Sequence, residues 1–130
     1  MAGTAKIDTI QSELSTPTVF KNSSGTEIGR FCRAWVNLTG TSPYNVRASF
    51  NFSSVAKQAG GGDFIYTMTT AMPDANYAMA GCAGAGADGA QTGTVAPWNV
   101  DPTASAFRSG CVYDGVTSYD NKWVTFMVTR

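Results

Sequence analysis

Carboxylates are the residues of this chain that could act as acids, bases or metal ligands. There are nine among 130 residues, and most stand beside Gly, Pro or Asn, where an Asp side chain usually bonds to the backbone of its own turn. A glycosidase needs two carboxylates roughly 5 to 10 Å apart across a cleft, and no pair is spaced for this task. Asp114 and Asp120 with nearby carbonyls could hold Ca²⁺, but the spacing of an EF-hand loop is absent. We therefore predict no metal site.

Histidine is absent from the chain. Its absence excludes Ser-His-Asp and Cys-His catalysis, and any zinc site with a His ligand. Gly84, Gly86 and Gly89 have the Gly-x-Gly-x-x-Gly spacing of a dinucleotide loop, but no helical periodicity follows them, so the βαβ unit that this motif needs is missing. We predict instead that residues 83–94 form a loop of small residues that is exposed or lies flat against another surface.

The three cysteines are Cys32, Cys82 and Cys111, an odd number without CxxC spacing. This pattern favours neither a disulfide framework nor a zinc site, and we expect buried thiols, with one disulfide as the alternative. The sequence thus offers no catalytic residue and implies no cofactor, and we predict that the protein is not an enzyme. Glycan hydrolysis stays open only if carboxylates of neighbouring chains converge.

Charged residues make up 14% of the chain and sum to zero, whereas Gly, Ser, Thr, Asn and Ala are abundant. Small polar residues suit strands and turns better than helices. Neither sign of charge forms a run, so we expect no nucleic-acid partner. No apolar run approaches the roughly 20 residues that span a bilayer, and we expect no membrane insertion.

Residues 1–30 differ from the rest of the chain. Residues 6–11 alternate polar and apolar side chains, with Ile7 and Ile10 on the apolar side, and polar, Pro- and Gly-containing segments follow them. One alternating segment cannot bury its apolar face within itself. We therefore expect residues 1–30 to be an arm that packs on its own domain or on another chain, and residues 31–130 to form one domain.

From residue 31 onward, apolar residues recur with a period close to two, as in β-strands. One face of residues 31–38 carries Cys32, Ala34, Val36 and Leu38, and the other carries Phe31, Arg33, Trp35 and Asn37. Residues 45–51 are predicted as a half-buried strand with Val46, Ala48 and Phe50 on its apolar side. Alternation resumes over residues 64–68 and again over residues 122–129. Short strands punctuated by turns predict an all-β fold, an antiparallel, jelly-roll-like β-sandwich with an extended N-terminal arm.

Aromatic residues are the best candidates for binding. Trp98 follows a Pro in a predicted loop, and Tyr113 and Tyr119 flank the predicted turn at Asp114. An exposed ring can stack on the apolar face of a sugar while neighbouring Asn, Asp and Ser supply hydrogen bonds. Core or interface packing is the other explanation for these rings. Trp35 is different, because one face of its strand is apolar and the other carries aromatic rings, and we expect Trp35 at an oligomer interface together with Ile7 and Ile10.

Several motifs also resemble a small β-domain of bacteriophage tail-fibre proteins and short virion proteins, especially those of marine and cyanobacterial phages. They are Arg33-Ala34-Trp35-Val36-Asn37, then Arg47-Ala48-Ser49-Phe50-Asn51 with Ser53-Ser54-Val55, and Thr69 to Tyr77. The resemblance spans about residues 5–80. Where relatives usually read Asp-Tyr-Thr-Val-Asn-Phe-Thr, this chain reads Asp-Phe-Ile-Tyr-Thr-Met-Thr from Asp63, a departure that preserves a strand.

The resemblance implies a virion protein, made in the host cytoplasm. The first hypothesis is a short tail fibre or receptor-binding tip, a homotrimer as phage fibres are, that contacts host surface polysaccharide. The second is a capsid cement or decoration protein that stabilises the head. In both, residues 1–30 would attach the chain to other virion proteins, and the segment beyond about residue 83 would vary as a recognition surface does.

Overall fold

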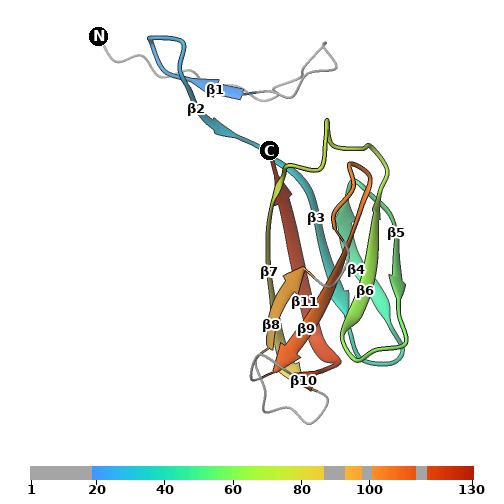
Figure 1. The fold of residues 1–130 in the computed structure, drawn as a ribbon. Helices are drawn as coiled ribbons and strands as arrows, with labels where there is room; N and C mark the ends of the chain where they lie inside the picture. Colours follow the sequence, from blue (N-terminus) through green and yellow to red (C-terminus); the bar gives the residue numbers. More distant parts are fainter. Residues whose placement is uncertain (1–18, 87–92, 98–100, 114–116) are drawn as a thin grey trace. The chain divides into compact units, whose positions relative to one another are not determined.

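Figure 1 shows the computed structural model, which describes residues 19–86, 93–97, 101–113 and 117–130. The chain divides into two compact units, Met1–Phe31 and Cys32–Arg130. This division lies next to the boundary that the sequence predicts at residue 31. Ile7 and Ile10, the apolar residues of the predicted arm, lie outside the described residues.

In the first unit, β1 (Val19–Lys21) and β2 (Glu27–Arg30) form an antiparallel hairpin. The side-chain oxygen of Asn22 accepts hydrogen bonds from the backbone N–H groups of Ser24 and Thr26, at 3.0 and 2.9 Å. Asn is frequent in turns because its side chain can bond to the local backbone in this way. The polar segment that follows residue 20 is therefore a hairpin turn.

The second unit is all-β in its described residues, and no helix occurs among them. Its strands are β3 (Cys32–Thr39), β4 (Asn45–Phe50), β5 (Phe52–Lys57), β6 (Asp63–Met68), β7 (Ala78–Gly86), β8 (Gly93–Pro97), β9 (Ala106–Tyr113), β10 (Thr117–Ser118) and β11 (Asn121–Thr129). They pair in the order β4-β3-β11-β7-β8-β9-β6-β5, with β10 beside β9, and every pairing is antiparallel.

The ladder folds over on itself to give two packed layers (Figure 1). The first layer holds β4, β3, β11 and β7, and the second holds β8, β9, β6 and β5. The layers are joined where Cys82 and Ala83 of β7 pair with β8. The order β11-β7-β8-β9 is that of a Greek key. The antiparallel β-sandwich that the sequence predicts is thus confirmed.

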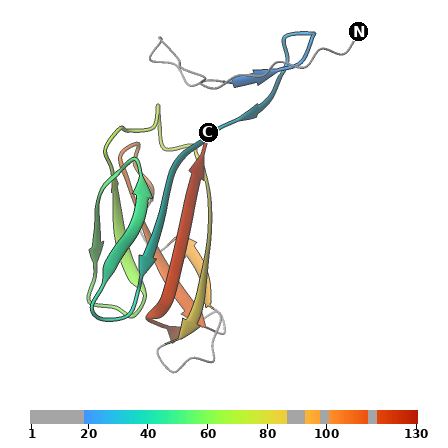
Figure 2. The same cartoon turned by 180° about the vertical axis from the view of Figure 1, so that it is seen from behind.

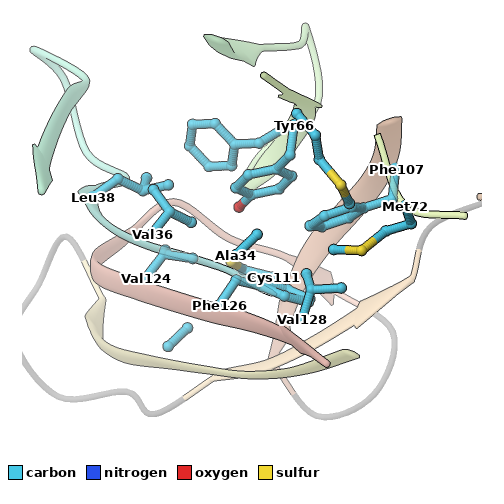
Figure 3. Close-up of a cluster of buried hydrophobic side chains, with 13 residues drawn as sticks. Ala34, Val36, Leu38, Tyr66, Met72, Phe107, Cys111, Val124, Phe126 and Val128 are labelled. Atoms are coloured by element: carbon cyan, nitrogen blue, oxygen red, sulfur yellow. The ribbon is translucent and has the colours of Figure 1, made fainter. Parts of the chain in front are cut away.

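The core lies between the two layers, as Figure 3 shows. Its buried apolar side chains are Ala34, Val36, Leu38, Phe64, Tyr66, Met68, Met72, Ala83, Phe107, Cys111, Val124, Phe126 and Val128. Tyr66 and Phe107 stack in parallel with ring centroids 4.8 Å apart, and Phe126 lies 5.2 Å from Phe107. The alternation over residues 31–38, 64–68 and 122–129 therefore identifies core-facing side chains correctly.

In β4 the observed alternation differs from the predicted one. The register with β3 shifts between Val46 and Ala48, which leaves Arg47 as an extra residue in the ladder. A bulge of this kind changes the side to which the following residues point. Ala48 and Phe50 therefore turn away from the core, and β4 is exposed along its whole length. The prediction of a half-buried strand at residues 45–51 is wrong.

The small-residue segment is also different from the prediction. β7 continues to Gly86, and Ala83 is buried in the core, so the first part of the predicted loop at residues 83–94 is a strand. Small residues are needed on this strand because aromatic rings fill the space beneath it. A Cβ atom on Gly81 would lie 2.8 Å from the ring of Phe126.

The cysteines are all free, but their burial differs. Cys111 is buried in the core, whereas Cys32 and Cys82 are exposed. The expectation of buried thiols is therefore confirmed for Cys111 and wrong for the other two. Burial raises the pKa of the Cys111 thiol to about 11, because an apolar environment disfavours the thiolate.

Candidate binding face

The outward side of the first layer exposes several large apolar side chains. Side chains alternate along a strand, so the partners of outward-facing Trp35 on the neighbouring strands face outward as well. Two rows of side chains cross the strands, from β4 to β7. The first row is Phe50, Trp35, Met127 and Ala80, and the second is Ala48, Asn37, Thr125 and Cys82. We call these two rows the Trp35 face; Figure 2 shows its strands from behind.

Large apolar side chains stand exposed in the first row. Phe50 is 54% exposed, Trp35 40% and Met127 55%. Exposed Leu or Val residues are common on monomers, but adjacent large apolar side chains on one sheet face mark an interaction surface. Trp, Phe and Met are also the residue types that are enriched at protein interfaces.

A shallow groove of about 500 Å³ crosses the Trp35 face. Trp35 and Asn37 of β3, Thr125 and Met127 of β11, and Ala80, Gly81 and Cys82 of β7 are among the residues that line it. The groove exists because β7 carries Ala and Gly where β3 and β11 carry Trp and Met. The face therefore presents projecting apolar side chains beside a floor of small ones.

Polar groups in the groove are few. The thiol of Cys82 lies 3.0 Å from the hydroxyl of Thr125. The side-chain oxygen of Asn37 is buried and has no hydrogen-bond partner among the described residues. A buried amide oxygen without a partner is costly, and burial keeps this atom from accepting a hydrogen bond from a group bound on the face.

Two cations lie close to the ring of Trp123, near the start of β11 and beside the Trp35 face. Trp123 is 43% exposed, and the guanidinium of Arg47 and the ammonium of Lys122 lie 5.8 and 5.3 Å from its ring centroid. The Nε of Arg47 also donates a hydrogen bond of 2.8 Å to the hydroxyl of Thr39. These cation–π contacts hold Arg47 beside the face, whose two rows contain no charged side chain.

The carboxylate of Asp120 is fully engaged at one end of the sandwich. It accepts a 2.6 Å hydrogen bond from the N–H of Gly62 and a 3.2 Å bond from the hydroxyl of Tyr44, and it pairs with the ammonium of Lys57 at 3.2 Å. These contacts join the start of β11 to the β5–β6 turn. Asp120 therefore has a structural role. Asp114, which the sequence analysis considers with Asp120 as a calcium ligand, lies outside the described residues.

A second acidic side chain joins two strands of the other layer. The carboxylate of buried Asp63 accepts hydrogen bonds from Nε and a terminal nitrogen of Arg108, at 2.8 and 2.5 Å. The hydrogen bond to Asp63 raises the pKa of Arg108 above its ordinary value. Paired hydrogen bonds of this kind fix geometry, and they tie β6 to β9.

The glycan-binding residues predicted from sequence are only partly described. Trp98 lies outside the described residues; Pro97, which precedes it, pairs with Ser109 in the middle of β9. Tyr113 ends β9 opposite Thr117, and its side chain is likewise outside the described part. Tyr119 is half-buried, and its N–H donates a 2.9 Å hydrogen bond to the carbonyl of Cys111.

Sequence reasoning singled out Trp35 but missed its neighbours on the face. Alternation over residues 45–51 predicts Phe50 on the apolar side with Val46, and it does not place Trp123 or Met127 beside Trp35. Alternation alone shows that two side chains share one face of their strand. Which strands lie beside one another, and so which outward residues meet, depends on cross-strand register that a single sequence does not display.

Other kinds of site receive no support from the described residues. They contain no group of three or more His, Cys, Asp or Glu side chains that could hold a metal ion. They also contain no helix long and apolar enough to cross a membrane. Comparison of the chain with protein-family models, with curated proteins and with solved structures finds no match.

Proposed function

We propose that this protein is a structural protein of a bacteriophage virion, a short tail fibre or receptor-binding tip that acts by binding. One observation carries the binding role: the exposed, uncharged Trp35 face, with Phe50, Trp35 and Met127 adjacent to one another. Surfaces of this composition bind protein partners. A particle assembled from many chains supplies such partners.

The motifs that resemble phage β-domains support the setting. Residues 33–37 form part of β3 and residues 47–51 reach from β4 to the corner before β5. Together these motifs supply Trp35, Asn37, Ala48 and Phe50 of the Trp35 face. The segments from which the resemblance comes are thus the same segments that build the apolar surface.

The trimer and the glycan contact are parts of the same proposal. The homotrimer comes from the resemblance alone, because contact between two identical faces pairs chains about a two-fold axis and does not by itself close a trimer. Host polysaccharide would meet Trp98, Tyr113 and Tyr119, in the segment beyond residue 83. The decoration protein is the alternative, and it uses the same apolar face against the capsid.

Competition for adsorption tests the receptor-binding proposal. The purified full chain is incubated with host cells, and adsorption of the phage that encodes it is then measured. We expect a dose-dependent loss of adsorption, and a weaker effect from Tyr119→Ala than from Phe20→Ala, a control at an exposed ring of the β1–β2 hairpin. A folded chain that neither binds the cells nor slows adsorption would contradict the receptor role and favour the decoration protein.

A further inference from the structure

We propose that the Trp35 face is the surface through which copies of this chain pack against one another. The occupant of the groove is then a second copy of the same face. This inference names the contact surface between chains, and it does not depend on where on a particle the chain is placed. Three properties of the face argue for it: its exposed apolar area, its shape and its charge.

The exposed apolar area is close to what a specific interface needs. Phe50, Trp35, Met127 and the adjoining Trp123 are 40% to 55% exposed. Because a large apolar or aromatic side chain has about 200 Å² of surface, these four expose about 400 Å² together. The smallest specific interfaces bury about 500 Å² on each partner. The small side chains of the two rows supply the remainder, so two such faces suffice.

The shape of the face is self-complementary. Trp35 and Met127 project beside the groove, whose floor on β7 is built from Ala80, Gly81 and Cys82. When two copies meet face to face, the projecting side chains of one can enter the groove of the other. A face with only projections, or only a groove, would need a different partner. Interfaces reach interior packing density in this way.

The charge distribution also permits self-association. A surface that meets its own copy sets identical groups near one another, and like charges in that position are destabilising. The two rows contain no charged side chain, and the two nearby cations, Arg47 and Lys122, lie against the ring of Trp123 at one end of the face. A glycan would need more donors and acceptors than Asn37, Thr125 and Cys82 provide.

The native cysteines allow a direct test. Cys82 lies within the Trp35 face and Cys32 lies outside it, and both thiols are exposed in the single chain. The full chain is treated with N-ethylmaleimide at several protein concentrations, and labelling of each cysteine is followed by mass spectrometry. We expect Cys82 to react at least several-fold more slowly than Cys32 at high concentration and to lose this protection on dilution. Sedimentation at the same concentrations gives the number of copies.

Two matched variants separate self-association from folding. Thr125→Arg places a cation in the middle of the face, whereas Thr67→Arg places one on β6 of the other layer, where Thr67 is also half-buried between core residues. We expect Thr125→Arg to sediment as a monomer with a freely reactive Cys82, and Thr67→Arg to keep the native assembly. Circular dichroism and a cooperative melting transition confirm that each variant is folded.

Three outcomes would overturn the inference. In the first, the native chain is a monomer and Cys82 reacts as fast as Cys32 at every concentration. In the second, Cys82 is protected to the same extent at every dilution of a monomer, which means that another part of the same chain covers the face. An assembly that folded Thr125→Arg leaves intact would also contradict it, because copies would then meet through a different surface. None of these outcomes depends on adsorption to cells.

Discussion

Replacing Trp35 by Ala separates the contribution of this side chain to folding from its contribution to association. Trp35 is 40% exposed, so about 100 Å² of a side chain of about 250 Å² is available to a partner. At about 25 cal/mol per Å², and allowing for the surface that Ala retains, each copy loses about 2 kcal/mol of association free energy. A contact that uses Trp35 from two copies loses about 4 kcal/mol, and its Kd rises roughly a thousand-fold.

The same substitution also affects the single chain. The buried part of Trp35 contributes to folding, and truncation of a large aromatic side chain typically costs about 3 to 5 kcal/mol. Sedimentation equilibrium gives the Kd, and urea unfolding at a concentration where the chain is monomeric gives the stability. Tyr44→Ala is the matched control, because Tyr44 is 44% exposed but lies outside the Trp35 face. A Kd that changes equally little in both variants, with both folded, would refute the reasoning.

Two predictions concern the fold. Gly62 has a φ of +62°, and a Cβ atom there would lie 2.1 Å from the carbonyl oxygen of Tyr119 and 2.7 Å from Cβ of Cys111. We therefore expect Gly62→Ala to lower the free energy of unfolding, measured in urea, by about 3 kcal/mol through backbone strain and overpacking. The control Gly60→Ala should change stability little, because a Cβ atom at Gly60 has ordinary contacts of 3.5 Å. Equal stability of the two variants would contradict this. The pKa of Cys111 is raised by burial from 9.0 to about 11, so the neutral thiol stabilises the fold fully below about pH 9, and about 2 kcal/mol is lost as the pH rises through 11. Burial raises the pKa of Tyr66 as well, which adds to the loss above pH 10. The melting temperature should fall over this range, less steeply in Cys111→Ala, and a constant melting temperature up to pH 11 would oppose the assignment.

Much of the fold follows from local alternation. The residues of β3, β6 and β11 that face the core, such as Val36, Tyr66 and Phe126, are those that a period of two selects. Alternation succeeds here because each strand belongs to one of two packed layers and directs every second side chain toward the other layer. The turns at Gly60–Gly62 and near Asp74 could also be placed from sequence, since Gly, Pro, Asp and Asn favour them for local reasons.

The parts that the sequence did not predict depend on contacts between distant strands. No local sequence feature indicates the bulge at Arg47, yet this bulge turns the side chains of Ala48 and Phe50 away from the core. The side chains around Ala83 are too small to indicate a core strand by themselves. They fit the core because aromatic rings from other strands fill the space beside them. The Trp35 face itself arises from pairing of β3 with β4 and β11, and so only its central residue was anticipated.

The position of this chain on the virion distinguishes a receptor-binding protein from a decoration protein. Intact particles are labelled with antibody against the purified chain and gold, and viewed by electron microscopy, with particles from an unrelated phage as the control. The proposed function predicts label at the tail or its fibres. Label spread evenly over the head would contradict the receptor-binding role in favour of decoration, and intact particles that carry no accessible or buried copy by mass spectrometry would contradict a virion role altogether.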